Sequence, residues 1–174
     1  YNLTITAEGT DDVPPQITDG TATVTIKADD FKRGDSIYTI IESSTREEAQ
    51  SKSKKLGGNL ITINNAEENQ YISSFIRSKI QDIYDLEHGS GDKSDKAEEW
   101  RYNPIIGYTD AQKEGEWKWL DGSSSTYTNW YPGEPSGDGD SAVLYLYGNI
   151  NKYNSLGRWN DAPGGTIGIT EISL

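Results

Sequence analysis

LGGNLITINNAEENQYI, residues 56–72, joins the end of one predicted helix to the start of another through a short predicted strand. Gly57 and Gly58 are typical of a helix C-terminus, because glycine readily adopts the left-handed conformation that often ends a helix. The apolar run NLITI has the length of a strand rather than a helix. Asn64 or Asn65 can then cap the next helix by accepting a hydrogen bond from a free backbone N–H.

The residues before this stretch predict the first helix, over residues 43–58. Ser44 or Thr45 can cap its start, and Glu47 or Glu48 can complete a capping box by bonding back to the cap residue. Such reciprocal hydrogen bonding is a strong sequence signal for a helix N-terminus.

Apolar residues indicate which faces of the two helices are buried. In the first helix, Ala49 and Leu56 are seven residues apart, and we expect both to face the core. The second helix, over residues 64–80, carries apolar residues at helical spacing, namely Ile72, Phe75, Ile76 and Ile80. Residues 81–103 are polar and mixed in charge, and we interpret them as a long surface insertion.

The remaining segments of the main domain predict strands. SIYTIIE (36–42) precedes the first helix. The later strand candidates are IIGY (105–108), EWKWLDG (116–122), SAVLYLY (141–147), GRWND (157–161) and TIGITEISL (166–174). Helices early in the chain and strands late in it indicate an α+β domain with an antiparallel sheet.

Residues 1–33 are predicted to be a separate β-rich segment, either the end of a preceding module or an edge hairpin of the main domain. NLTITA and TATVTIKA alternate as strands do. DGTATVTI (19–26) resembles the closing strand of immunoglobulin-like or cadherin-like repeats in large bacterial surface adhesins. DDFKRGD (29–35) is interpreted as a linker, so the main domain is expected to span residues 34–174.

Composition excludes several classes of function. The net charge of −12 disfavours nucleic acids and anionic membrane surfaces, and no apolar run is long enough to insert into a bilayer. The absence of cysteine excludes disulfides, thiolate catalysis and cysteine-based zinc sites. The single histidine, His88, is expected to be a solvated loop residue. Because the chain begins at Tyr1 and lacks methionine, we expect a monomeric module excised from a longer protein.

Acidic residues gather in segments that we expect to be turns or strand ends. TDAQKE (109–114) carries Asp110 and Glu114, GEPSGDGD (133–140) carries Glu134, Asp138 and Asp140, and RWND (158–161) carries Asn160 and Asp161. Acidic residues in a single glycine-rich turn are usually solvated turn formers. A pattern shared by several segments instead favours calcium, which takes about six to eight oxygen ligands, over magnesium, which requires a tight octahedron.

The same motifs resemble a known family, the C-type lectin-like domain, from about Gly34 to Leu174. IIGYTD stands where that family has a hydrophobic W-I-G-L-like strand, and RWND matches its W-N-D motif. EPS stands where carbohydrate-binding members have E-P-N or Q-P-D, and residues 56–72 match the region that joins their two helices. The resemblance implies two helices, antiparallel sheets and a long calcium-binding loop region.

The resemblance also implies one principal calcium ion and one or more auxiliary ions. The implied ligands of the principal ion are Glu134, Ser136, Asp140, Asn160 and Asp161. The implied ligands of an auxiliary ion are Asp110 and Glu114, with Asp138 and Asp140 closing the site. The bond before Pro135 is expected to be cis, as in the family.

Two departures from the family pattern bear on the site. Ser136 replaces the usual asparagine, and a hydroxyl is a poorer calcium ligand than an amide carbonyl, so Asp138 is a candidate to fill the vacant position. Ala142 and Thr170 occupy two cysteine positions of the family, so calcium and the Trp/Tyr core must stabilise the fold instead. Most of the five tryptophans are expected to be core residues.

The favoured hypothesis is a non-enzymatic, calcium-dependent lectin that binds cell-surface glycans through vicinal hydroxyls of mannose, glucose or fucose type. The principal calcium ligands would contact the sugar, and Ala162, Tyr131, Tyr145 or Tyr147 would border it. Such a module would act in adhesion at a bacterial cell surface or outside the cell. The alternatives are a protein or ice ligand with structural calcium, a calcium-rigidified stalk, and a glycosidase, which bound calcium disfavours because it lowers carboxyl pKa values.

Overall fold

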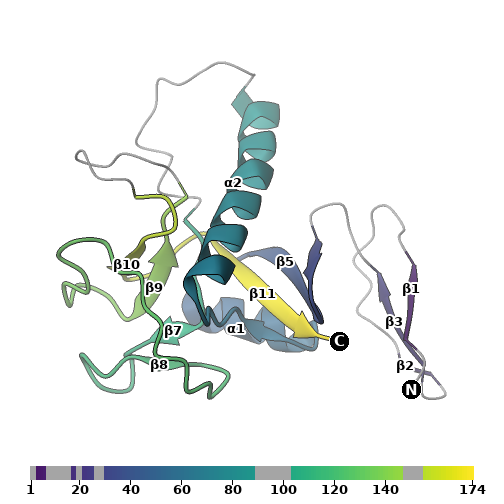
Figure 1. Ribbon diagram of the computed structural model, residues 1–174, viewed down its shortest axis with the longest axis horizontal. Helices are drawn as coiled ribbons and strands as arrows, with labels where there is room; N and C mark the ends of the chain where they lie inside the picture. Colours follow the sequence, from purple (N-terminus) through teal and green to yellow (C-terminus); the bar gives the residue numbers. More distant parts are fainter. Residues whose placement is uncertain (1–2, 7–16, 19–20, 26–29, 89–102, 147–154) are drawn as a thin grey trace.

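The computed structural model describes residues 3–6, 17–18, 21–25, 30–88, 103–146 and 155–174 (Figure 1). Its main part contains two helices, a four-stranded antiparallel sheet and two small antiparallel strand pairs. The α+β class with antiparallel sheets is therefore confirmed. No helix among the described ranges is both long and apolar enough to cross a membrane.

The four-stranded sheet has the order β4 (Phe31–Arg33), β5 (Ser36–Glu42), β11 (Ile167–Ser173), β6 (Asn59–Leu60). β5 and β11 pair along their whole length, with Ile40 opposite Ile169. Because strand side chains alternate between faces, Tyr38 and Ile169 join the larger core cluster, whereas Ile41 packs on the smaller cluster around Ala49 and Leu60.

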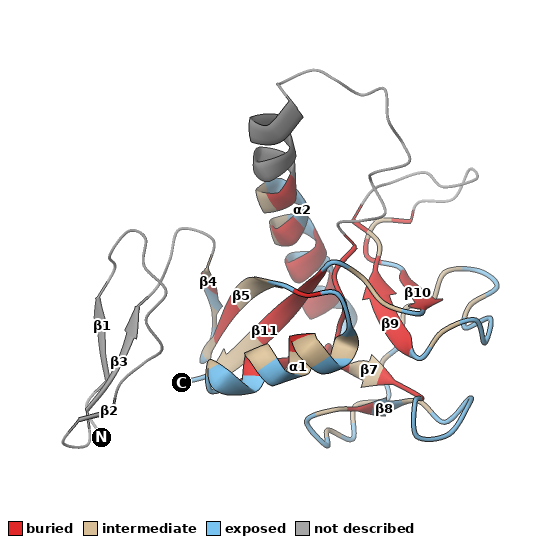
Figure 2. Ribbon diagram, turned by 180° about the vertical axis from the view of Figure 1, so that it is seen from behind, coloured by how far each residue is buried: buried red, intermediate tan, exposed pale blue. Residues whose placement is uncertain are grey.

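The helix α1 (Arg46–Lys55) lies across β5, β6 and β11 (Figure 2). Thr45 caps it, and Glu48 accepts a hydrogen bond at 2.8 Å from the N–H of Ser44, one residue before the cap rather than from the cap itself. Ala49 is buried as expected, but Leu56 lies beyond the last helical residue and is only half-buried. Ser53, one helical turn after Ala49, takes the buried position instead.

A close approach between α1 and β11 depends on Gly168. A Cβ atom at that position would lie 3.2 Å from the Cβ of Ala49 and 2.9 Å from Cδ2 of Leu60. Glycine at this position therefore leaves room for the helix to lie close to the strand, since a side chain here would have to push Leu60 and Ala49 away.

The helix α2 (Ala66–His88) is capped by Asn65, whose Oδ1 accepts a hydrogen bond from the Glu68 N–H at 2.9 Å. Ile72, Ile76 and Ile80 are buried, and Phe75 is half-buried, as the helical spacing predicts. The helix runs further than expected. Residues 81–88, which were assigned to a surface insertion, are helical, and His88 is the last helical residue rather than a loop residue. Residues 89–102 lie outside the described residues.

The interpretation of residues 29–35 as a linker is wrong for β4. Phe31 is 6% exposed and stacks on Tyr38 with ring centroids 4.9 Å apart, so its aromatic side chain places this segment in the sheet. Upstream, β1 (Leu3–Thr6), β3 (Thr21–Thr25) and β2 (Ile17–Thr18) form a three-stranded sheet in which β1 and β3 are parallel.

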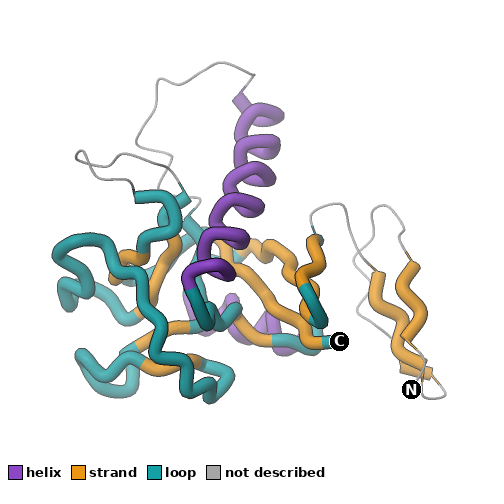
Figure 3. The backbone as a smooth tube through the Cα atoms, in the orientation of Figure 1, coloured by secondary structure: helices purple, strands orange, loops and turns teal. Residues whose placement is uncertain are grey.

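Loops dominate the half of the domain that contains the remaining strands (Figure 3). These strands are β7 (Tyr108–Thr109), β8 (Lys118–Trp119), β9 (Ser141–Leu144) and β10 (Trp159–Ala162). These strands are shorter than the segments that the sequence predicts. β9 ends at Leu144, and Ile105 forms only isolated bridges. Trp159, fully buried, lies between the rings of Trp119, Trp130, Tyr127 and Tyr108, which confirms that these tryptophans build core.

Candidate functional site

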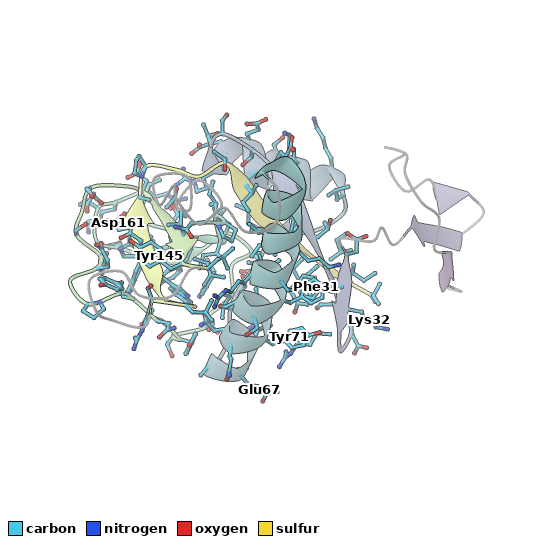
Figure 4. All side chains as sticks on the ribbon, turned by 90° about the horizontal axis from the view of Figure 1, so that it is seen from above. Phe31, Lys32, Glu67, Tyr71, Tyr145 and Asp161 are labelled. Carbon is cyan, nitrogen blue, oxygen red and sulfur yellow. The ribbon has the colours of Figure 1, made fainter. Side chains whose placement is uncertain are left out.

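Three of the expected acidic ligands come together at one end of the domain. Glu134, Asp138 and Asp161 each place one carboxylate oxygen within 4.8 Å of the other two. Asp161 lies on β10 and is 1% exposed, whereas Glu134 is half-buried and Asp138 is exposed on the loop between β8 and β9. Figure 4 shows Asp161 and Tyr145 far from Phe31 and Glu67, at the loop-rich end. We call Glu134, Asp138 and Asp161 the acidic triad.

Backbone hydrogen bonds hold the loop against β10. The Gly137 N–H donates to Oδ2 of Asp161 at 2.8 Å, and the Ser136 N–H donates to Oε2 of Glu134 at 2.9 Å. The Ser136 hydroxyl donates to Oδ1 of Asp138 at 3.0 Å. The Glu134–Pro135 peptide bond is cis, as the family resemblance implies.

Gly139 brings the same loop into contact with the backbone of β10. A Cβ atom at this position would lie 2.0 Å from the carbonyl carbon of Ala162, closer than any atom can approach. The loop can therefore follow this path only with glycine at residue 139.

Asp110 and Glu114 also approach the triad. Asp110 is 2% exposed, and its Oδ2 accepts a hydrogen bond from the Gly115 N–H at 2.8 Å. Oε1 of Glu114 lies 3.2 Å from the point where a Cβ on Gly137 would stand, so its carboxylate lies beside the loop that carries the triad.

Two buried carboxylate oxygens at this site lack hydrogen-bond partners among the described residues. They are Oδ1 of Asp110 and Oδ1 of Asp161. Burial raises the pKa of the Asp161 carboxyl, and the charges of Asp110, Asp138 and Glu134 raise it further, against the opposing hydrogen bond from Gly137. Buried, unpaired and mutually repelling carboxylates are costly, and a bound cation would satisfy them. The donor set, all oxygen, fits calcium.

The other expected ligands are placed differently. The side chain of Asp140 is exposed and does not join the acidic triad, whereas that of Asp138 does. Asn160 is half-buried, and its Nδ2 donates to the Asp161 carbonyl oxygen at 2.9 Å. Ala162, expected to border the ligand, is 9% exposed and packs in the smaller core cluster.

Tyr145 and Tyr131, two of the tyrosines expected to border the ligand, lie beside the triad. Burial raises the pKa of the Tyr145 hydroxyl, and the charge of Glu134 raises it further. Its ring meets that of Tyr131 edge to face, with centroids 5.7 Å apart. Tyr147 lies outside the described residues.

Two residues that sequence reasoning missed hold the end of the loop. Arg46, the first residue of α1, donates from Nη1 to the Asp140 carbonyl oxygen at 3.0 Å and also bonds the Thr109 hydroxyl. The Thr109 hydroxyl in turn donates to the same Asp140 carbonyl at 2.5 Å. Thr109 stands directly before Asp110, which is a usable signal, but nothing local in the sequence connects Arg46 to a residue 94 positions away.

Comparison with known families places this arrangement. Residues 42–166 match the Lectin C-type domain family. The chain belongs to the C-type lectin domain family. The fold expected from the resemblance is thereby confirmed, including the two helices and the antiparallel sheets. C-type lectin domains are mostly extracellular or surface-exposed and generally non-enzymatic.

Solved structures, C-type lectin domains among them, resemble this chain along nearly all of their own length. The carbohydrate-recognition domain of mouse scavenger receptor C-type lectin is 28% identical, with a TM-score of 0.57 over 84% of this chain and 96% of its own. That of cow CD23, solved in the presence of a GlcNAc2Man3 oligosaccharide, is 22% identical, with a TM-score of 0.58 over 86% and 97%. A calcium-independent type II antifreeze protein is 18% identical, with a TM-score of 0.58 over 84% and 92%.

Proposed function

We propose that this C-type lectin domain binds calcium at the acidic triad and uses it to bind carbohydrate at a glycosylated cell surface. The observation that carries the proposal is the pair of buried, unpartnered oxygens, Oδ1 of Asp161 and Oδ1 of Asp110. Without a cation, both would be desolvated without compensation, which costs about 1–3 kcal/mol or more for each group.

The acidic residues divide naturally between two calcium ions. Glu134, Asp138 and Asp161 would hold the principal ion, because their oxygens already converge. Asn160 and Ser136 are close in sequence to these residues and would complete the set. Asp110 and Glu114 would hold an auxiliary ion, since Asp110 is buried and raises the pKa of Asp161 through its charge.

The exposed side of the triad is suited to a sugar. Bound calcium would supply open coordination positions for two adjacent hydroxyls of a pyranose ring. Glu134 and Asp138, which are half-buried and exposed, would accept charge-assisted hydrogen bonds from those hydroxyls. Tyr131 and Tyr145 would border the ring. The glutamate of the E-P-S motif favours vicinal hydroxyls of mannose, glucose or fucose type.

Calcium titration by calorimetry and a glycan array with and without chelator test this proposal. We expect Glu134→Gln and Asp161→Asn to weaken calcium binding by at least about tenfold and to abolish glycan binding. Glu67→Gln, which neutralises an exposed carboxylate on α2 far from Asp161 (Figure 4), is the matched control and should change neither. Calcium-independent glycan binding, or none at all, would contradict the proposal.

A second candidate function keeps the calcium and replaces the sugar with a protein or another non-sugar ligand. It is favoured by Ser136, which stands at the motif position that carries an amide in sugar-binding members and whose hydroxyl is engaged by Asp138. Calcium binding that depends on Asp161, combined with an empty glycan array, would select this candidate. Adhesion as part of a bacterial surface protein, with the residues before β4 as a preceding module, belongs to the same proposal.

A further inference from the structure

A cavity of about 360 Å³ lies between the first turns of α2 and two segments of the loop-rich half, residues 127–129 and 156–158. Its helix side consists of residues that recur three or four positions apart and so share one face of α2, namely Ala66, Asn69, Gln70, Ser73 and Ser74. We call this cavity the α2 pocket. It contains no member of the acidic triad, and its volume lies at the lower end of the range typical of small-molecule sites.

Hydrogen bonds fix the buried lining residues of the α2 pocket. The Gly157 carbonyl oxygen accepts from Nδ2 of Asn69 at 2.9 Å and from Nδ2 of Asn129 at 2.6 Å. Oδ1 of Asn69 accepts from Nε1 of Trp159 at 2.8 Å, and the Ser73 hydroxyl donates to the Asn69 carbonyl oxygen at 2.5 Å. Because these bonds join α2 to the start of β10, the two sides of the pocket are held in place before a ligand binds.

Two exposed side chains of the lining are available to a ligand. Gln70 and Ser74 are exposed, and neither side chain has a hydrogen-bond partner among the described residues. They are four residues apart, so they are neighbours on the surface of the helix. The amide of Gln70 and the hydroxyl of Ser74 can each donate to an oxygen of a bound molecule.

Arg158 is the one charged residue among the described residues that line the pocket. It is exposed, and its Nη1 donates to Oδ1 of Asn129 at 3.1 Å and to the Trp130 carbonyl oxygen at 3.5 Å. Within the described part of the chain, its Nη2 and Nε have no acceptor and it pairs with no carboxylate. A guanidinium anchored by one nitrogen, with the others free, can bind a carboxylate through two parallel hydrogen bonds.

The Arg158 guanidinium also lies near the ring of Tyr127, which lines the pocket. Burial raises the pKa of the Tyr127 hydroxyl, and the positive charge of Arg158 opposes that rise. The ring is half-buried and meets Trp159 edge to face, with centroids 5.7 Å apart. The pocket therefore places a fixed aromatic ring beside a positive charge.

The acidic residues of the first turn of α2 are directed to a different cation. Glu67 and Glu68 face Arg33 on β4, at 3.4 Å and 3.8 Å. The net charge of −12 disfavours a polyanion that spans much of the surface, but charges farther apart than about 8 Å are largely screened at physiological salt. A ligand with a single anionic group would instead meet a lining whose net charge is positive.

We propose that the α2 pocket binds a pyranose that carries one carboxylate, such as a uronic acid, and binds it without calcium. The Arg158 guanidinium would bind the carboxylate, and Gln70 and Ser74 would donate to ring hydroxyls. The Tyr127 ring would contact the apolar face of the sugar. This site goes beyond the proposed function, because it needs neither the acidic triad nor a metal ion.

NMR titration of the calcium-free protein with methyl glucuronide tests the proposal. We expect saturable shifts of the Arg158 Nε–H and Gln70 side-chain amide resonances, with a dissociation constant in the millimolar range. The methyl ester of the glucuronide lacks the charge, and N-acetylglycine lacks the sugar ring, so each should bind at least about tenfold more weakly. Asp161→Asn should give the same glucuronide titration as the wild type, even though it removes calcium binding.

Arg158→Gln removes the guanidinium and should weaken glucuronide binding at least about tenfold, as followed on the Gln70 amide. Arg77→Gln removes the charge of an exposed arginine on α2 that does not line the pocket, so this matched control should leave the affinity unchanged. If R158Q fails to fold, the wild-type comparison of the glucuronide with its ester remains decisive. The proposal would be overturned by an absence of shifts, by equal binding of the ester or of N-acetylglycine, by undiminished binding in R158Q, or by a requirement for calcium.

Discussion

The side-chain oxygens of Ser53 on α1 and Thr170 on β11 lie 2.7 Å apart, and both residues are fully buried. Ser53 also donates to the Ala49 carbonyl at 2.9 Å, so the pair links the first helix to the central strand. The family resemblance implies a cysteine at the position of Thr170. In this chain, which has no cysteine, a hydrogen bond between two hydroxyls joins the elements at that position.

We expect the double substitution S53C/T170C to form a disulfide that stabilises the domain. The two positions are 117 residues apart in sequence, and closing so long a loop reduces the entropy of the unfolded chain, for a gain of about 2–4 kcal/mol. Thermal unfolding of the oxidised and reduced protein measures the gain. The single substitutions S53C and T170C are the controls, and an oxidised form no more stable than the reduced one would refute the prediction.

Gly139→Ala should disrupt the calcium loop. The added methyl group would meet the Ala162 backbone, whose carbonyl oxygen would lie 2.3 Å from it, so the loop must move away from β10. We expect calcium affinity to fall more than about tenfold, together with a loss of about 1–3 kcal/mol in unfolding free energy. Gly164→Ala is the control, since its Cβ would make an ordinary contact 3.4 Å from the Ser44 carbonyl oxygen. Equal calcium affinities in the two variants would contradict the interpretation.

Arg46→Lys tests whether α1 positions the acidic loop. Lysine keeps the positive charge but loses the fork that bonds both the Asp140 carbonyl and the Thr109 hydroxyl. We therefore expect calcium affinity to fall about tenfold without a change in net charge. Lys54→Arg, on an exposed position of the same helix, serves as the control in the same calorimetric titration. An unchanged affinity in R46K would show that the contact does not position the site.

Ser136→Asn should strengthen calcium binding. An amide carbonyl is a better ligand than a hydroxyl, and the Ser136 hydroxyl is already directed to Asp138. We expect a gain of about threefold to tenfold in calcium affinity. Ser136→Ala, which removes the hydroxyl and adds no ligand, should show no gain. If S136N binds calcium no more tightly than S136A, residue 136 does not reach the ion.

Glu171→Gln should stabilise the domain at neutral pH. Burial raises the pKa of Glu171, and the charge of Glu68 raises it further; Tyr38 bonds both carboxylates, at 3.4 Å and 3.3 Å. The pKa of Glu171 is therefore higher in the folded protein than in the unfolded chain. The free energy of unfolding then falls as the pH rises from the pKa in the unfolded chain through the pKa in the folded protein. Glutamine has no carboxyl group to titrate, so the E171Q variant should not lose this stability.

Chemical unfolding over a pH series checks the Glu171 prediction. The difference between E171Q and the wild type should be small below about pH 4, where the unfolded carboxyl is protonated, and reach its full size near neutrality. A difference that stays constant across the series would mean that Glu171 does not titrate differently in the two states.

Local signals explain which parts of the fold the sequence could predict. The cap of α1 and the glutamate that bonds back across it lie close together in the chain, so Thr45 and Glu48 could be assigned from spacing alone. The full extent of α2 also has a local signal, because Ile83 and Tyr84 follow Ile80 at helical spacing, but the polar, mixed-charge residues beyond them favour a surface insertion. The place of Phe31 is harder to predict, because it packs on Phe75 of α2, far away in sequence, although its partner Tyr38 on β5 lies only across the β4–β5 turn.

In the candidate site, too, some residues can be predicted from the sequence and others cannot. Glu134 and Asp161 follow from short motifs, and the structure brings them together. Sequence spacing alone does not decide whether Asp138 or Asp140 joins Glu134 and Asp161, because that depends on how the loop passes β10 at Gly139. The hydrogen bond from Arg46 to the Asp140 carbonyl oxygen depends on the placement of α1 beside the loop, and no local sequence pattern predicts that placement.

The chain enters and leaves the main domain at neighbouring places. β4 and β11 flank β5, and the Leu174 N–H donates to the Asp35 carbonyl oxygen in the turn between β4 and β5 at 2.7 Å (Figure 1). The acidic triad lies at the opposite end. Residues 30–174 could therefore be inserted into a surface hairpin of a carrier protein without forcing the ends of that hairpin apart. The calcium loop would then face outward, and the domain would serve as a transferable binding module in protein engineering.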